Sequence, residues 1–317
     1  MATTMTGNDT IRIGTRGSRL ARIQTDYVRR QVHTACPGVA LEVLVIRTAG
    51  DEDPGRRPAR MSGTGIFTRA IERALLAGEI DMAVHSLKDL PTAGPPGLTV
   101  AAIPVRADPW DALVGCKAEA LAAAAGLRLG TSSIRRAAQI RRAYPGCDVV
   151  ELRGNLDTRL RKVEDGLVDG AILAVAGLQR FGRADAITHI FAADIMLPAP
   201  GQGALAIQTR EDDAGLRALL APIHCERTAA CVTAERAFLH ALDAGCRTPV
   251  GALAEADGNT IVLRGRVISL DGARCLEAER AGHRSTSAEI GRALAAQVLA
   301  AGAAELLRQT EREMSHE

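Results

Sequence analysis

The chain carries one pattern of strands, loops and helices twice, and this repetition limits the possible folds more than any other feature. The first copy opens with an apolar strand at Ile11–Ile13 and the second with one at Leu127–Leu129. In both copies a loop of Gly, Ser and Thr follows, then a helical pattern, a Pro-Gly turn and a further strand. This order, present twice, predicts two related α/β domains with mostly parallel sheets.

Later segments of the two copies also match. The next strands end in polar loops at Arg47–Asp51 and Arg153–Asn155, and Gly78–Val84 then corresponds to Gly166–Ile172. Chance similarity between ordinary α/β units is the alternative explanation. In α/β domains ligands bind beyond the carboxyl ends of the strands. We therefore expect ligand contacts in these loops, and two facing domains would enclose a cleft.

The rest of the chain predicts a crossing segment and a smaller third domain. Pro198–Ala204 is irregular, and the apolar Ala204–Ile207 is expected to be a strand that returns to the first domain. An α+β domain follows, with these expected elements: a helix at Thr228–Leu242, strands at Ala252–Ala256 and Thr260–Ile268, and a final helix at Ser287–Arg308. The expected boundaries are 10–105 with 200–220 for the first α/β domain, 106–199 for the second, and 221–317 for the third.

Composition excludes several classes of protein. Of the 317 residues 47% are hydrophobic and 24% are charged, as in ordinary globular proteins. The net charge of +2 and the 2% of aromatic residues argue against a nucleic-acid partner. No apolar run reaches the roughly 18 residues of a membrane span. The start shows no signal-peptide pattern and the seven Cys include no Cys-x-x-Cys pair, so we expect a cytoplasmic protein with no membrane partner and no metal site.

Arginine outnumbers lysine by 36 to 3 among the 39 basic residues. A codon bias of the genome explains most of this count, but not the position of individual arginines. Arg135 and Arg136 stand at the start of a predicted helix, where each opposes the helix dipole by roughly 0.3–1 kcal/mol unless an anion binds there. Loops at equivalent or neighbouring strand ends add four more: Arg16, Arg19, Arg153 and Arg159. A solvated surface explains any one of them, but together they predict a ligand with several carboxylates or phosphates.

Two further positions are candidates for chemistry. Lys88 and Asp89 follow a short apolar strand at the expected ligand-binding edge, and Asp89 is a candidate for proton transfer or for stabilising a cation. His85 competes for that role, although a structural histidine is the simpler interpretation. Cys246 lies in a Gly-x-x-x-Pro-x-Gly loop rather than in an apolar periodic run, so we expect it to be accessible and open to covalent attachment.

Several of these segments occur in the order found in one known family: Val84–Pro91, Gly130–Arg136, Leu152–Asn155, Thr158–Leu160, Leu173–Leu178, Gly201–Ala204, Val232–Arg236 and Gly245–Gly251. Together they resemble the porphobilinogen deaminase (hydroxymethylbilane synthase) family over nearly the whole chain. The resemblance implies a monomer with two periplasmic-binding-protein-like, doubly wound α/β domains and a smaller α+β C-terminal domain.

The resemblance also implies a transferase of tetrapyrrole and heme biosynthesis. Cys246 would carry one covalent dipyrromethane cofactor through a thioether. Four porphobilinogen units would be added head to tail with loss of ammonia, and water would release hydroxymethylbilane. Asp89 matches the family's catalytic aspartate, which would stabilise the positive charge left by ammonia. The residues that match the family's cofactor and substrate contacts are Arg16, Ser18, Lys88, Thr131, Ser133, Arg135, Arg136, Arg153 and Arg159.

The chain departs from the family pattern at two positions. Thr64 stands where family members commonly have a lysine in a loop over the cleft, and Trp110 replaces a usual arginine. Arg56, Arg57 and Arg60 are candidates to compensate for the missing lysine.

Two alternatives come from other functional classes. One is a non-catalytic, two-lobed binding protein for a polyanionic small molecule, against which the third domain with Cys246 argues. The other is an Arg-rich nucleic-acid binder built on Ile134–Arg142, against which the near-neutral net charge argues.

Overall fold

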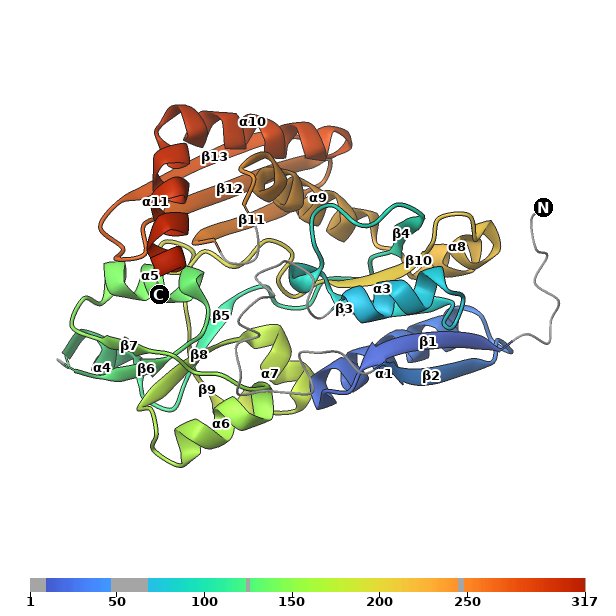
Figure 1. Cartoon of the computed structure of the whole chain (residues 1–317), viewed down its shortest axis with the longest axis horizontal. Helices are drawn as coiled ribbons and strands as arrows, with labels where there is room; N and C mark the ends of the chain where they lie inside the picture. Colours follow the sequence, from blue (N-terminus) through green and yellow to red (C-terminus); the bar gives the residue numbers. More distant parts are fainter. Residues whose placement is uncertain (1–9, 47–67, 124–125, 245–247, 317) are drawn as a thin grey trace. The chain divides into compact units, whose positions relative to one another are not determined.

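The computed structural model describes residues 10–46, 68–123, 126–244 and 248–316. These residues divide into two compact units (Figure 1). The first unit draws on Met1–Ala107 and Ala204–Ala229, and the second on Asp108–Gly203 and Ala230–Glu317. Each unit therefore combines two separate parts of the chain.

The first unit is built on a five-stranded sheet with the order β2-β1-β3-β10-β4. Its strands are β1 (Ile11–Arg16), β2 (Leu41–Ile46), β3 (Met82–Ser86), β4 (Leu98–Ala102) and β10 (Leu205–Arg210). Strand β1 is parallel to β2 and β3, whereas β10 is antiparallel to β3 and β4. The predicted return of Ala204–Ile207 to the first sheet is confirmed.

Helices cover both faces of this sheet. They are α1 (Arg19–Ala35), α3 (Arg69–Leu76) and α8 (Ala214–Leu220). Met82 and Val84 of β3 pack in one apolar cluster with Val28 of α1. Ala83 lies between them in the sequence and packs in a different cluster with Ile71 of α3. Because successive strand residues point to opposite faces, this division places α1 and α3 on opposite sides of the sheet.

The second unit contains a matching sheet with the order β7-β6-β8-β5-β9. Its strands are β5 (Asp111–Val114), β6 (Arg128–Gly130), β7 (Asp148–Val150), β8 (Gly170–Ala174) and β9 (Ile187–Ile190). Its helices are α4 (Ala118–Ala123), α5 (Ile134–Ala143), α6 (Leu156–Glu164) and α7 (Val175–Phe181). Leu173 of β8 packs with Leu160 of α6, whereas the preceding Ile172 packs with Ile140 of α5. Both predicted α/β regions are thus doubly wound.

The duplication extends to single contacts. Strand β6 is parallel to β7 and β8, and β5 is antiparallel to β8 and β9, so the two sheets correspond strand for strand. In the first sheet the Asp81 carboxylate accepts hydrogen bonds from the Arg12 backbone N–H (2.9 Å) and guanidinium (2.8 Å). In the second, Asp169 accepts the same two bonds from Arg128, at 2.8 and 2.9 Å. The repeat predicted from the sequence is therefore present in the structure.

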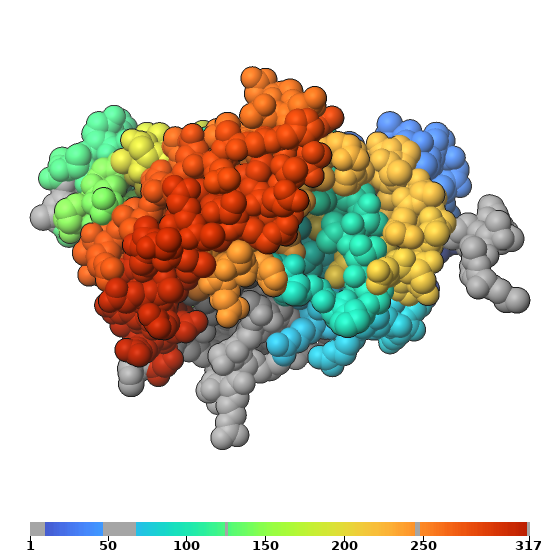
Figure 2. Space-filling view, turned by 90° about the horizontal axis from the view of Figure 1, so that it is seen from above, coloured from blue at the N-terminus to red at the C-terminus, as the bar shows by residue number. Residues whose placement is uncertain are grey.

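A smaller three-stranded sheet with the order β11-β12-β13 completes the second unit. Its elements are α9 (Glu226–Ala241), β11 (Val250–Asp257), β12 (Thr260–Ile268), β13 (Cys275–His283), α10 (Ser287–Ala300) and α11 (Ala303–His316). Phe238 of α9 fits over Gly265 of β12, where a Cβ atom would come within 2.6 Å of the ring. Leu294 and Leu306 join the same core cluster from α10 and α11. In Figure 2 these last two helices belong to the red end of the surface, next to orange atoms from the strands of this sheet.

The sequence prediction for this region was partly wrong. It gave two strands, whereas the structure has the third strand β13. The single final helix expected at Ser287–Arg308 is two helices, bent by 80°. The bend occurs at Gly302, whose φ of 104° lies in the left-handed region that favours glycine. The predicted boundary of a separate domain at 221–317 stays a prediction.

Among the described residues, no single helix is both long and apolar enough to cross a membrane. The bent pair α10 and α11 reaches that length and apolarity only when the two helices are taken together.

Candidate functional site

In the first unit, the candidate residues lie where β1 and β3 end. Arg16 is the last residue of β1, and Ser18 is the N-cap of α1, where its Oγ accepts a hydrogen bond from the Ala21 N–H at 3.3 Å. Gln24 of α1 exchanges two hydrogen bonds with Ser86 at the end of β3, at 3.0 and 3.2 Å. Because β1 and β3 are parallel neighbours, their carboxyl ends lie at the same edge of the sheet.

Lys88 and Asp89 occupy a short 3₁₀ turn, Leu87–Asp89, directly after β3. Leu87 and Leu90 on either side are buried, and the Leu90 N–H closes the turn on the Leu87 carbonyl at 3.1 Å. Lys88 is half-buried and Asp89 is exposed. The two leucines anchor the turn, so the carboxylate of Asp89 is held at the edge of the sheet rather than in the core.

His85 has the surroundings of a structural residue. It is buried, and its Nε2 lies 3.1 Å from Oε1 of Gln208 on β10. Burial, together with the positive charge of Arg16, lowers the pKa of His85 to about 4. The ring is therefore neutral near pH 7 and its Nε2 is engaged inside the sheet, as the simpler interpretation of the sequence expected.

In the second unit, the loops after β6 and β7 meet. Ser133 is the N-cap of α5, and its own N–H donates to Oγ1 of the buried Thr131 at 3.2 Å. Arg159 of α6 donates to the Gly154 carbonyl at 2.8 Å and to the Ser132 hydroxyl at 3.0 Å. Arg153, in the loop three residues after β7, pairs with Glu151 at 2.7 Å. Hydroxyls and guanidiniums therefore gather at the carboxyl edge of this sheet.

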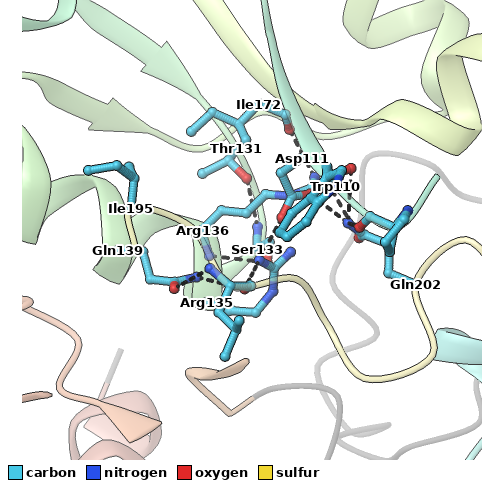
Figure 3. Close-up of polar contacts among 12 residues, drawn as sticks. Trp110, Asp111, Thr131, Ser133, Arg135, Arg136, Gln139, Ile172, Ile195 and Gln202 are labelled. Carbon is cyan, nitrogen blue, oxygen red and sulfur yellow. Dashed lines mark hydrogen bonds and ion pairs between the residues drawn. The ribbon is translucent and has the colours of Figure 1, made fainter. Parts of the chain in front are cut away.

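Arg135 and Arg136 are buried, which differs from the open helix start expected from the sequence (Figure 3). Both bind Asp111, the first residue of β5. Nη1 of Arg135 lies 2.7 Å from Oδ2 of Asp111, and Nη2 of Arg136 lies 2.7 Å from Oδ1. Gln202 adds a hydrogen bond from Nε2 to Oδ1 at 2.9 Å. The charges that oppose the dipole of α5 are thus compensated first by a protein carboxylate.

The electrostatics of this cluster favour the ionised form of Asp111. Burial alone would raise the pKa of Asp111, but the charges of Arg135 and Arg136 outweigh it and hold that pKa well below its usual range. Burial lowers the pKa of Arg135, and the Asp111 carboxylate opposes this effect. One carboxylate balances two guanidiniums, so the cluster carries one surplus positive charge. A ligand carboxylate is the natural partner for such a surplus.

Sequence reasoning missed Asp111 as part of this site. The signal was present, because Asp111 is an acidic residue at the head of the apolar strand Asp111–Val114. An acidic residue that is fully buried in a strand requires a cationic partner. The sequence could not name that partner, since Arg135 lies 24 residues further along the chain.

Three singled-out positions remain to be placed. Cys246 and Thr64 lie outside the described residues. Trp110 is half-buried against the apolar cluster of the second sheet, and its carbonyl accepts a hydrogen bond from the Val175 N–H at 3.0 Å. Trp110 thus contributes to packing in the second sheet.

Comparisons with known proteins agree over almost the full chain. A family model described as "Porphobilinogen deaminase, dipyromethane cofactor binding domain" matches residues 11–218, and one described as "Porphobilinogen deaminase, C-terminal domain" matches residues 229–300. The chain is 44% identical over 302 residues to the porphobilinogen deaminase of Syntrophus aciditrophicus, which covers 95% of this chain and 99% of that protein. It is also 44% identical over 300 residues to the porphobilinogen deaminase of Roseiflexus castenholzii, covering 94% and 99%.

Among solved structures, a TRAP periplasmic solute binding protein from Desulfovibrio salexigens aligns with a TM-score of 0.41 at 12% identity, covering 68% of this chain and 72% of that one. The family models and the relatives together identify the chain. It belongs to the porphobilinogen deaminase family, whose members are transferases with a dipyrromethane cofactor binding domain.

Proposed function

We propose that the chain condenses four porphobilinogen units head to tail onto a covalent dipyrromethane primer, with loss of ammonia, and then releases hydroxymethylbilane by hydrolysis. The proposal rests on the charged residues at the carboxyl edges of the two α/β sheets, in a chain that belongs to this family. One edge holds the exposed Asp89 beside Lys88, and the other holds the positively charged Asp111 cluster.

The donor set fits a dipyrromethane and a porphobilinogen. Each pyrrole ring of these molecules carries an acetate and a propionate. Guanidiniums bind carboxylates in a bidentate way, and hydroxyls donate single hydrogen bonds. The second unit offers both kinds of donor at Thr131, Ser133, Arg153 and Arg159, next to the surplus charge of Arg135 and Arg136. In the first unit we assign the same role to Arg16, Ser18 and Lys88.

We assign the chemical step to Asp89. When ammonia leaves porphobilinogen with the electrons of the C–N bond, positive charge develops on the methylene-pyrrole. The Asp89 carboxylate would stabilise that charge and accept the proton that the attacking pyrrole carbon loses. Its exposure suits this role, because a reactant can reach the carboxylate without any rearrangement of the core.

We assign Cys246 as the attachment point of the cofactor, through a thioether. The dipyrromethane, when bound, supplies the terminal pyrrole carbon that the first porphobilinogen unit is added to. In the sequence, Cys246 falls between the end of α9 at Ala241 and the start of β11 at Val250. A cytoplasmic monomer is part of the same proposal.

Turnover of porphobilinogen tests this function. The purified protein should release ammonia and consume porphobilinogen in equal amounts, and hydroxymethylbilane should accumulate. The same protein unfolded in urea provides the control. Stoichiometric binding of porphobilinogen without release of ammonia would instead support the two-lobed binding protein.

A further inference from the structure

Arg266 is a buried arginine on β12, far along the chain from the residues assigned to binding. Only 4% of it is exposed. Its guanidinium has five N–H donors, and each has an acceptor. Nε donates to Glu277 at 2.7 Å, and Nη1 donates to Gln139 at 2.6 Å. The three remaining donors bind the carbonyls of Ala193, Asp194 and Ile195, at 3.0, 2.9 and 3.2 Å.

The three carbonyls belong to a single turn of the chain before Leu197. This turn is closed by the Ile195 and Met196 N–H groups, which both donate to the Ala192 carbonyl, at 3.1 and 2.9 Å. A guanidinium that binds the free carbonyls at the end of a helical turn stabilises that turn. Arg266 thereby fixes the segment that leads into Leu197.

Gln139 of α5 connects Arg266 to the same Leu197. Its Nε2 donates to the Leu197 carbonyl at 3.1 Å, and its Oε1 accepts from the Leu197 N–H at 2.9 Å. The guanidinium has only donors, so the oxygen of the Gln139 amide must face Arg266. Arg266 and the Leu197 N–H therefore share the amide oxygen, so Arg266 helps to hold Gln139 in the orientation that makes both bonds to Leu197.

The Leu197 carbonyl is also an acceptor for Arg135. Nη1 of Arg135 donates to it at 2.8 Å and to Asp111 at 2.7 Å. A continuous chain of hydrogen bonds thus runs from Arg266 through Gln139 and Leu197 to Arg135. Glu277 lies directly opposite Arg266 on β13, so this link adds no net charge to the cluster.

We propose that Arg266 is a positioning residue, which holds the guanidinium of Arg135 in place for a substrate carboxylate through Gln139 and Leu197. This inference rests on the proposed function. It extends the site to the C-terminal sheet and names a residue that acts without touching the substrate.

Arg266→Met tests the proposal, with Arg264→Met as the matched control. Arg264 lies two residues earlier on the same strand and pairs with Glu277 and Glu279 at 3.7 and 3.3 Å, but it is only half-buried, with a side chain that is 40% exposed. We expect Arg266→Met to raise the KM for porphobilinogen about tenfold while kcat changes less than about threefold, because a ground-state carboxylate contact is displaced. Arg264→Met should keep the wild-type KM.

A second variant tests the proposal if Arg266→Met fails to fold. Arg266→Lys keeps the positive charge beside Glu277 but cannot serve five acceptors, and it should raise KM at least threefold, on the order of a weakened hydrogen bond. A KM for porphobilinogen within twofold of the wild-type value, in either Arg266 variant that folds, would overturn the proposal. This holds even if that variant is less stable than the wild-type protein.

A readout without turnover separates this inference from the proposed function. The Nε–H resonance of Arg135, identified by its loss in Arg135→Lys, should shift in Arg266→Met and stay in place in Arg264→Met. If the wild-type protein released no ammonia, the proposed function would fail, and this resonance alone would decide the positioning role. An unshifted resonance would then refute it.

Discussion

The two α/β regions share one scaffold but differ at the positions where chemistry is expected. Their sheets have the same strand order, and each holds its first strand with the same pair, Arg12–Asp81 in one and Arg128–Asp169 in the other. Counting from these aspartates, Asp89 of the first region corresponds to Gly177 of the second. The carboxylate is exposed, whereas the second region continues into the largely buried helix α7.

At the start of α5 and of its counterpart α1, the buried charged residues lie in the second region instead of the first. The start of α5 carries Arg135 and Arg136, buried against Asp111. Counted from the N-caps Ser133 and Ser18, the corresponding residues of α1 are Leu20 and Ala21, which follow Arg19. The two regions therefore share their strand order and differ in the charged residues at these positions. We assign the acid–base carboxylate to the first region and the central carboxylate-binding charge to the second.

The largest effect that this comparison predicts is on turnover. Asp89→Ala should lower kcat by about 10²–10⁴-fold, the usual contribution of a general acid or base. The side chain is exposed, so the urea midpoint should stay unchanged. Glu79→Ala, which removes an exposed carboxylate elsewhere in the same unit, is the control. A wild-type kcat in Asp89→Ala would show that Asp89 is not the acid–base residue assigned to the first region.

The second effect concerns stability and compares a buried ion pair with an exposed one. Asp111→Asn leaves two buried guanidiniums without their anion and should lower the free energy of unfolding by about 3–5 kcal/mol. Asp169→Asn removes an exposed partner of Arg128 and should cost about 1 kcal/mol or less. Urea unfolding measures both values. Equal losses in the free energy of unfolding would mean that the buried Asp111 cluster stabilises the protein no more than the exposed Arg128–Asp169 pair does.

The smallest effect is a dependence of stability on pH that arises from His85 of the first region. His85 corresponds to Leu173 in the second region, and its pKa of about 4 lies below the ordinary value of 6.5. Between these pH values the unfolded chain binds more protons, so stability falls as the pH decreases from 6.5 towards 4. The loss should reach roughly 3 kcal/mol near pH 4.

His85→Gln removes the titrating ring and provides the control. Urea unfolding of both proteins at pH 7 and pH 4.5 measures the difference in slope. If the two proteins lost equal stability between these pH values, His85 would not be the neutral, buried group that the geometry indicates.

Local patterns allowed much of the fold to be predicted from the sequence. The strand predicted at Ile11–Ile13 and the loop of Gly, Ser and Thr after it depend on neighbouring residues, and both repeat in the second copy. The strand β13 was missed because the apolar alternation of Leu276 and Ala278 stops at the exposed Arg280. The break at Gly302 was missed because the apolar pattern continues on both sides of it.

The site was harder to predict than the fold. The positions of Arg16, Lys88 and Asp89 follow from the order of the strands. The burial of Arg135 and Arg136 does not, because it depends on Asp111 and Gln202, which reach α5 from distant parts of the second unit. The link from Arg266 to Arg135 is likewise invisible in the sequence, since 127 residues separate Arg266 from Gln139.

The mass of the intact protein tests the central claim most directly. Protein purified from cells that make porphobilinogen should exceed its polypeptide mass by two linked pyrrole units. Cys246→Ala should lack this adduct, and Cys36→Ala should retain it. A bare polypeptide mass for the wild-type protein, or an adduct that survives Cys246→Ala, would contradict the assignment of Cys246 as the residue that carries the primer.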